Sequence, residues 1–121
     1  MRVRALDHVG LHVTDVARAR SFYAEVLGLE ELPRPDFDFP GVWFALGEMQ
    51  ELHLIGKGAS GDGRFKECHT SLEVEDLDGM AASLSALGLD FRGPAPRPDG
   101  ARQVFLADPD GHVIELLEFP G

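Results

Sequence analysis

The sequence predicts an α+β fold built from two tandem βαβββ modules. The first observation is an internal repeat, because four residues of the first module recur 61 positions later. They are His8, Leu11, Val13 and Asp15, matched by His69, Leu72, Val74 and Asp76. The second is that strand-like and helix-like patterns follow the same order in both copies. The third is the length of 121 residues, which fits one ordinary domain. We divide this single domain, residues 1–121, into a first module over 1–56, a linker over 57–64 and a second module over 65–121.

The first module begins with apolar and polar residues that alternate over 6–13, which is typical of a strand with one buried face. Asp15 follows as a natural N-cap, and apolar residues at helical spacing continue toward Gly28. Because glycine tolerates a left-handed backbone, we expect Gly28 to end this helix. Three short strands are then expected over 30–32, 42–46 and 51–55.

The second module repeats this order. A strand is expected over 68–74, followed by a helix that begins at its cap Asp76 and ends at Gly88. Three strands are expected over 90–92, 103–107 and 113–119. The apolar spacing of the helix comes from Leu77, Met80, Leu84 and Leu87. Two proline-containing stretches, 33–40 and 93–100, are expected to be loops that rim a cavity.

The composition excludes several classes of partner. The chain has 11 basic and 21 acidic residues and a formal net charge of −10, which argues against nucleic acid and anionic membranes. No apolar run approaches the roughly 18 residues of a membrane span. The single cysteine, Cys68, rules out an internal disulfide and fits a cytoplasmic location. We expect Cys68 to be a buried structural thiol.

Alternation along the strands gathers metal-binding side chains on the sheet face turned away from the helices. His8 and His53 fall on this face in the first module, and His69 and Glu115 fall on it in the second. A lone histidine in a strand is more often an ordinary packed or exposed residue, so the prediction depends on the agreement of all four in face and repeat position. Three imidazoles and a carboxylate suit one divalent metal per site, either Zn²⁺, Ni²⁺, Co²⁺, Mn²⁺ or Fe²⁺.

With these residues in place, the sequence resembles the vicinal-oxygen-chelate superfamily, also called the glyoxalase/bleomycin-resistance/dioxygenase superfamily. The motifs that carry the resemblance span the whole chain and are specific to the superfamily as a set, but not to one activity. They are Asp7-His8-Val9, Phe22-Tyr23 followed by Val26-Leu27-Gly28-Leu29, His69 at the start of the second module, and Asp108-Pro109-Asp110-Gly111-His112-Val113-Ile114-Glu115-Leu116.

The resemblance implies that the two modules form a cupped mixed sheet around one divalent metal, which is held by His8, His53, His69 and Glu115. It also implies a homodimer in which two chains exchange modules, so that each site takes two ligands from each chain. The metal would chelate two adjacent substrate oxygens and stabilise a developing oxyanion, with Glu115 as the catalytic base. His53 departs from the glutamate or glutamine of glyoxalases and epimerases, so we expect it to be a fourth ligand or a catalytic acid/base.

The resemblance favours a metal-dependent lyase or isomerase of the glyoxalase type that acts on a small oxygenated substrate. Two alternatives stay open. One is a non-haem Fe(II) dioxygenase with His8, His69 and Glu115 as ligands, and the other is a metal-free protein that sequesters a ligand, like the bleomycin-resistance members. Substrate contacts are expected from His12 and Arg97, which lie where glutathione lyases carry arginine and lysine, and from Trp43, Phe37 and Arg102.

Overall fold

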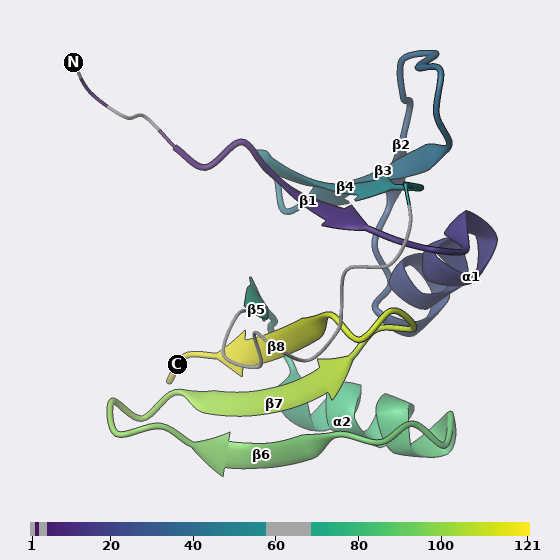
Figure 1. Ribbon diagram of the computed structural model, residues 1–121. Helices are drawn as coiled ribbons and strands as arrows, with labels where there is room; N and C mark the ends of the chain where they lie inside the picture. The colour runs from purple at the N-terminus through teal and green to yellow at the C-terminus, as the bar shows by residue number, and fades with distance from the viewer. Residues whose placement is uncertain (1, 3–4, 58–68) are drawn as a thin grey trace. The chain divides into compact units, whose positions relative to one another are not determined.

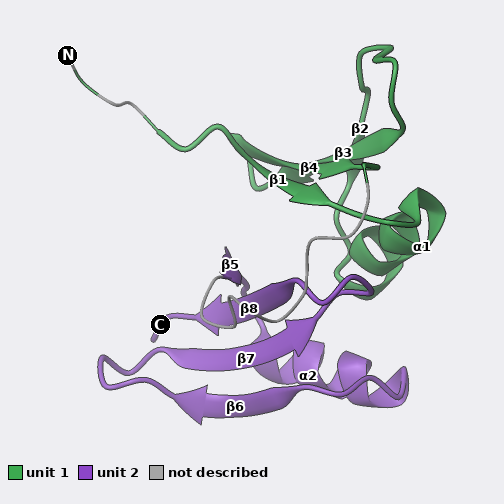
Figure 2. Cartoon of the chain, in the orientation of Figure 1, with its two compact units in different colours: residues 1–60 green, residues 61–121 purple. Residues whose placement is uncertain are grey.

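The computed structural model describes residues 2, 5–57 and 69–121 (Figure 1). The chain divides into two compact units, residues 1–60 and 61–121 (Figure 2). Of the predicted linker over 57–64, only residue 57 is described, and Cys68 also lies outside the described residues. In its described part, each unit has one strand, a helical segment and three further strands in that order, which confirms the α+β class and the two tandem modules.

Unit 1 contains a four-stranded mixed sheet in the order β1-β4-β3-β2. Strand β1 is parallel to β4, whereas β3 is antiparallel to both β4 and β2. The bounds are β1 (His8–His12), β2 (Glu31–Leu32), β3 (Gly41–Leu46) and β4 (Gln50–Ile55). Helix α1 (Val16–Ser21) packs against β3 and β4. The core between helix and sheet includes Tyr23, Phe44, Leu52 and Leu54, all buried.

The first helical segment changes its hydrogen-bonding pattern along its length. Asp15 accepts a hydrogen bond from the Arg18 amide and so caps α1 as predicted. The helix then widens into a π-helical turn, η1 (Phe22–Val26), in which the Leu27 amide donates to the carbonyl of Phe22. Both Phe22 and Tyr23 are buried in this turn. Gly28 follows with a φ of 73°, in agreement with its predicted role at the helix end.

Unit 2 has the matching sheet order β5-β8-β7-β6, with β5 parallel to β8 and the other neighbours antiparallel. The strands are β5 (His69–Glu73), β6 (Arg92–Pro96), β7 (Arg102–Ala107) and β8 (Val113–Glu118). Helix α2 (Leu77–Ala86) packs against β6, β7 and β8 and buries Leu77 and Leu84. Leu87, which continues the apolar spacing, is 57% exposed because it lies at the helix end, next to Gly88 with its φ of 72°.

The structure corrects the predicted boundary between a strand over 90–92 and a loop over 93–100. Strand β6 instead runs from Arg92 to Pro96 and pairs with β7 through Ala95 and Pro96. Two features explain why prolines are tolerated here. Strand β6 lies at the edge of its sheet, where a missing amide donor faces no second strand, and its register shifts between Arg92 and Ala95.

Among the described residues, no helix combines the length and the apolar character that a membrane crossing requires.

Candidate functional site

Strand alternation in unit 1 places His8, Trp43 and His53 on the sheet face opposite α1. Trp43 on β3 is directly opposite His53 on β4, and Gly10 on β1 is opposite His53 on the other side. The three rings form a continuous stack. The ring centroids of Trp43 and His53 are 4.0 Å apart with an interplanar angle of 3°, and those of His53 and His8 are 4.1 Å apart at 18°.

Each histidine of this stack also contacts a carboxylate. His8 Nδ1 lies 2.8 Å from Asp7 Oδ2, and His53 Nε2 lies 2.8 Å from Glu51 Oε1. The His53 side chain is only 12% exposed, whereas that of His8 is 47% exposed. We call the five residues Asp7, His8, Trp43, Glu51 and His53 the unit 1 cluster. In metal sites, a carboxylate that accepts a hydrogen bond from the second ring nitrogen of a histidine ligand orients its imidazole.

The loop between β2 and β3 extends the aromatic surface beyond Trp43. The Phe37 ring lies 6.0 Å from that of Trp43 and 5.4 Å from that of Phe39, and Phe37 is 42% exposed. The Arg34 guanidinium lies 4.9 Å from the centroids of both phenylalanine rings and donates to the Phe39 carbonyl. The loop is therefore held by cation–π contacts and one hydrogen bond, with Phe37 placed next to the unit 1 cluster.

Unit 2 brings its two expected ligands together on the sheet face opposite α2. His69 on β5 and Glu115 on β8 approach to 3.0 Å between Nε2 and Oε1. Glu115 is 3% exposed, and Gln103 on β7 donates from Nε2 to its Oε2 at 2.7 Å. The Phe105 ring lies edge-on to His69 at 6.0 Å. We call His69, Gln103 and Glu115 the unit 2 cluster; its buried carboxylate is a pre-positioned oxygen donor.

The expected ligands are divided two and two between the units. Among residues 2, 5–57 and 69–121, no three His, Cys, Asp or Glu side chains are grouped as a metal site requires. His8 and His53 stack within unit 1, and His69 and Glu115 are paired within unit 2. Their union in one four-ligand site stays a prediction.

Arg97 directly follows β6 and forms a bidentate ion pair with Asp99. Its Nε and Nη2 donate to the two Asp99 carboxylate oxygens at 2.9 and 2.6 Å. This pair raises the pKa of Arg97, and the charge of Glu115 adds to the effect, which indicates that the guanidinium lies within electrostatic reach of the unit 2 cluster. The same hydrogen bonds, together with one from the Ala101 amide, lower the pKa of Asp99 from 3.8 to about 2. A substrate contact through Arg97 stays a prediction.

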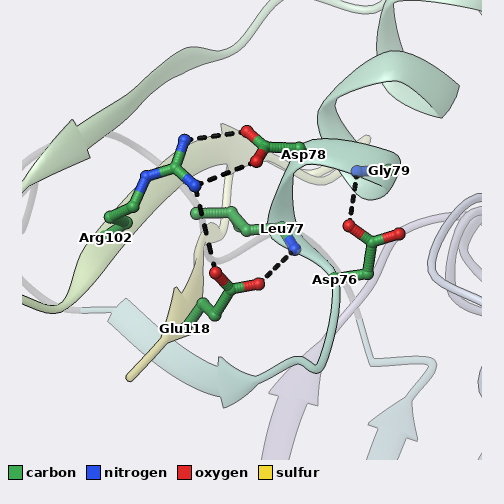
Figure 3. A network of polar contacts seen from close by, with 6 residues as sticks. All are labelled: Asp76, Leu77, Asp78, Gly79, Arg102 and Glu118. Atoms are coloured by element: carbon green, nitrogen blue, oxygen red, sulfur yellow. Dashed lines mark hydrogen bonds and ion pairs between the residues drawn. The ribbon is translucent and has the colours of Figure 1, made fainter. Parts of the chain in front are cut away.

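Arg102 lies on the opposite face of the unit 2 sheet from Glu115. Its guanidinium donates to both carboxylate oxygens of Asp78 in α2, at 2.8 and 3.1 Å (Figure 3). This pairing lowers the pKa of Asp78. Glu118 lies 3.9 Å from the same guanidinium and accepts the Leu77 amide at the start of α2. Arg102 therefore links α2 to the sheet of unit 2 through ion pairs. Because it lies on the face covered by the helix, we do not include it in the proposed site.

His12, the remaining residue expected to contact substrate, is the exposed last residue of β1 and shares the face of His8 by alternation. Sequence reasoning missed the roles of Glu51 and Gln103. Alternation puts Glu51 on the same face as His53, and the β7–β8 register puts Gln103 opposite Leu117, two residues from Glu115 on the same sheet face. The alternation of Glu51 and His53 could be seen in the sequence, but two residues that share a face need not form a hydrogen bond, and the register that places Gln103 is known only from the structure.

The chain belongs to the Glyoxalase/Bleomycin resistance protein/Dioxygenase superfamily, whose family model matches residues 5–116. This confirms the resemblance.

The comparisons with individual proteins extend over nearly the whole chain. The fosfomycin resistance protein FosX of Mesorhizobium japonicum is 28% identical over 94% of this chain and 78% of its own length. A crystal structure of a proposed glyoxalase family protein from Bacillus anthracis has a TM-score of 0.85 and 29% identity, and covers 99% of this chain and 100% of that one. A mutant FosX from Listeria monocytogenes, complexed with Mn(II) and 1S,2S-dihydroxypropylphosphonic acid, has a TM-score of 0.82 at 20% identity, over 98% of this chain and 95% of that one.

Proposed function

We propose that this protein is a divalent-metal-dependent lyase or isomerase of the glyoxalase type. Its substrate would be a small molecule that presents two adjacent oxygens. The observation that carries the proposal is the pairing of expected ligands in each unit, His8 with His53 and His69 with Glu115, on sheet faces turned away from the helices. Family membership and a relative solved with Mn(II) and a small dihydroxy compound support it.

The side chains suit such a metal. Imidazole nitrogens and a carboxylate oxygen are the donors preferred by Zn²⁺, Ni²⁺, Co²⁺, Mn²⁺ and Fe²⁺. Asp7 and Glu51 orient the two imidazoles of unit 1, and Gln103 orients Glu115. A metal held by His8, His53, His69 and Glu115 would supply Lewis acidity toward the two substrate oxygens.

Glu115 is the residue we assign to proton transfer. Its carboxylate is buried, and Gln103 occupies Oε2, so Oε1 is the oxygen that faces His69. A carboxylate held in this way is positioned to take a proton from the substrate carbon next to a chelated oxygen. Trp43, Phe37 and His12 would bind the rest of the substrate, and Arg97 would receive an anionic group.

The test is metal binding by the purified protein. We expect about one divalent ion per chain in wild type, and we expect His8→Ala, His69→Ala and Glu115→Gln each to weaken binding by at least about 100-fold, because loss of an outer partner alone costs about 10–100-fold. His112→Ala is the matched control, since His112 is not an expected ligand. Isothermal titration calorimetry with Mn²⁺, Co²⁺, Ni²⁺ and Zn²⁺ measures the affinities.

Two results would decide against this function. A wild-type protein that takes up no divalent ion, yet binds small aromatic ligands, would favour the ligand-sequestering alternative. Iron uptake with ring cleavage of catechol would favour the dioxygenase. For the proposed enzyme, metal-dependent hydrogen–deuterium exchange at the carbon beside a carbonyl, followed by NMR over a panel of α-hydroxy carbonyl compounds, should disappear in Glu115→Gln.

A further inference from the structure

His53 is the least typical residue of the expected ligand set, and its surroundings restrict how it can bind anything. Glu51 and His53 are two residues apart on β4 and share one sheet face. Glu51 Oε1 lies 2.8 Å from His53 Nε2. An ionised carboxylate can only accept hydrogen bonds, so the hydrogen in this contact belongs to Nε2. A neutral imidazole carries one N–H, which leaves the lone pair on Nδ1.

The ring stack opposes any rearrangement that would exchange the two nitrogens. One face of the His53 ring is covered by Trp43 at 4.0 Å and the other by His8 at 4.1 Å. Turning the ring about its Cβ–Cγ bond would force it between these neighbours and would open the stack on both sides. The His53 side chain is 12% exposed, so water competes little with the Glu51 carboxylate for Nε2.

We infer that Glu51 is a positioning residue that fixes His53 in the Nε2–H tautomer, so that Nδ1 is the nitrogen His53 offers to a divalent metal. The metal part of this inference rests on the proposed function, whereas the tautomer does not. His8 provides an internal comparison. Its Nδ1 contacts Asp7, so by the same reasoning His8 has the opposite tautomer and offers Nε2. The two imidazoles of unit 1 would thus present different nitrogens. Because an imidazole lone pair lies in the plane of its ring and these two rings are nearly parallel, His8, whose side chain is 47% exposed, would have to leave the stack to bind the same ion as His53.

The first experiment determines the tautomers of the metal-free, full-length protein at alkaline pH, where imidazole is neutral. Long-range ¹H–¹⁵N correlation spectra distinguish a protonated ring nitrogen from one with a lone pair. We expect Nε2–H for His53 and Nδ1–H for His8 in wild type. In Glu51→Gln the amide can either donate to Nε2 or accept from it, so we expect His53 to become a mixture of both tautomers.

Glu48→Gln is the matched control, because Glu48 is exposed in the turn between β3 and β4. We expect its His53 spectrum to equal that of wild type. A wild-type His53 protonated on Nδ1 overturns the inference, as does a Glu51→Gln protein whose His53 tautomer is unchanged. Backbone amide spectra show whether Glu51→Gln is folded, and the wild-type spectrum decides the tautomer even if that variant is not.

The second experiment adds Zn²⁺, which is diamagnetic. We expect the His53 Nδ1 resonance of wild type to move on binding, and Zn²⁺ affinity to fall about 10–100-fold in Glu51→Gln but not in Glu48→Gln. Coordination through His53 Nε2 overturns the inference. A wild-type protein that binds no Zn²⁺ or other divalent ion overturns the proposed function instead, and the tautomer assignment is then decided by the metal-free spectra.

Discussion

Glu115 shows how single side chains prepare the proposed site. Burying a carboxylate costs free energy unless hydrogen-bond donors replace the water it loses. Gln103 donates to one oxygen of Glu115, and His69 lies 3.0 Å from the other. Both partners come from neighbouring strands of the same sheet, so the carboxylate is held by elements whose positions are fixed by strand pairing.

Asp99 gives a pH-dependent prediction at the same scale. Its folded pKa of about 2 is below the ordinary value of 3.8, chiefly because of its hydrogen bonds with Arg97. A carboxyl group with a lowered folded pKa stabilises the fold above its unfolded pKa, and this contribution is lost as the pH falls from about 3.8 toward 2. In Arg97→Gln we expect the pKa of Asp99 to move back toward 3.8, although the Ala101 amide still lowers it.

Carboxyl ¹³C chemical shifts followed over the acid range measure this pKa. Arg92→Gln is the matched control, since Arg92 lies over the Phe105 ring and not beside Asp99. A pKa of Asp99 that stays near 2 in Arg97→Gln would show that Arg97 is not the main cause. Because Arg97 is also expected to meet an anionic part of the substrate, Asp99→Asn, which keeps the guanidinium but removes the charge of its partner, tests whether the ion pair holds the guanidinium in place for that role.

At the scale of elements, α1 and α2 both begin with an aspartate N-cap. The Asp76 carboxylate accepts the Gly79 amide at the start of α2, as Asp15 accepts the Arg18 amide at the start of α1. A side chain at Gly79 would collide with the Asp76 carboxylate, so glycine here leaves room for the cap. Glu118 satisfies a further free amide of α2, that of Leu77, and Arg102 bridges Glu118 and Asp78 (Figure 3).

We therefore predict that Asp76→Ala lowers the free energy of unfolding by about 1 kcal/mol, the usual cost of losing an N-cap. Asp76→Asn should lose much less, because its side-chain oxygen can still accept the amide hydrogen. Asp90→Ala removes an exposed aspartate outside the helix and should change little. Urea unfolding followed by circular dichroism measures all three, and an equal loss in Asp76→Ala and Asp90→Ala would refute the capping role.

At the scale of the whole molecule, we propose that two chains exchange modules, so that His8 and His53 of one chain face His69 and Glu115 of the other. Light scattering should then give a mass of about twice 13.2 kDa. A sharper test mixes His8→Ala with Glu115→Gln after separate purification and joint refolding. In a mixed dimer of exchanged modules, one site receives both substitutions and the other receives neither.

High-affinity metal binding should therefore return in this mixture to about one quarter of the wild-type sites, since about half of the dimers are mixed and each has one intact site. A site built within one chain would always contain one substitution, so binding would stay absent in the mixture. Mixing His8→Ala with His53→Ala is the control, because both substitutions lie in the same module and no intact site can form in either arrangement.

The sequence alone determined the features that depend on local spacing. The repeat offset predicted two modules, Asp15 and Asp76 predicted helix starts, and alternation predicted which face carries His8, His53, His69 and Glu115. These succeed because the periods of strands and helices are properties of a few consecutive residues. The prediction failed for β6, where pairing with β7 outweighs the turn preference of the prolines.

Only the tertiary structure decided which side chains are partners. Glu51 bonds to His53, Gln103 to Glu115, and Arg102 to Asp78 across 24 residues. These contacts depend on strand register, on side-chain rotamers and on the packing of a helix over the sheet. None of these appears as a periodic pattern in the sequence. The chain itself thus specifies which residues share a face, while the folded protein determines which atoms of those residues meet.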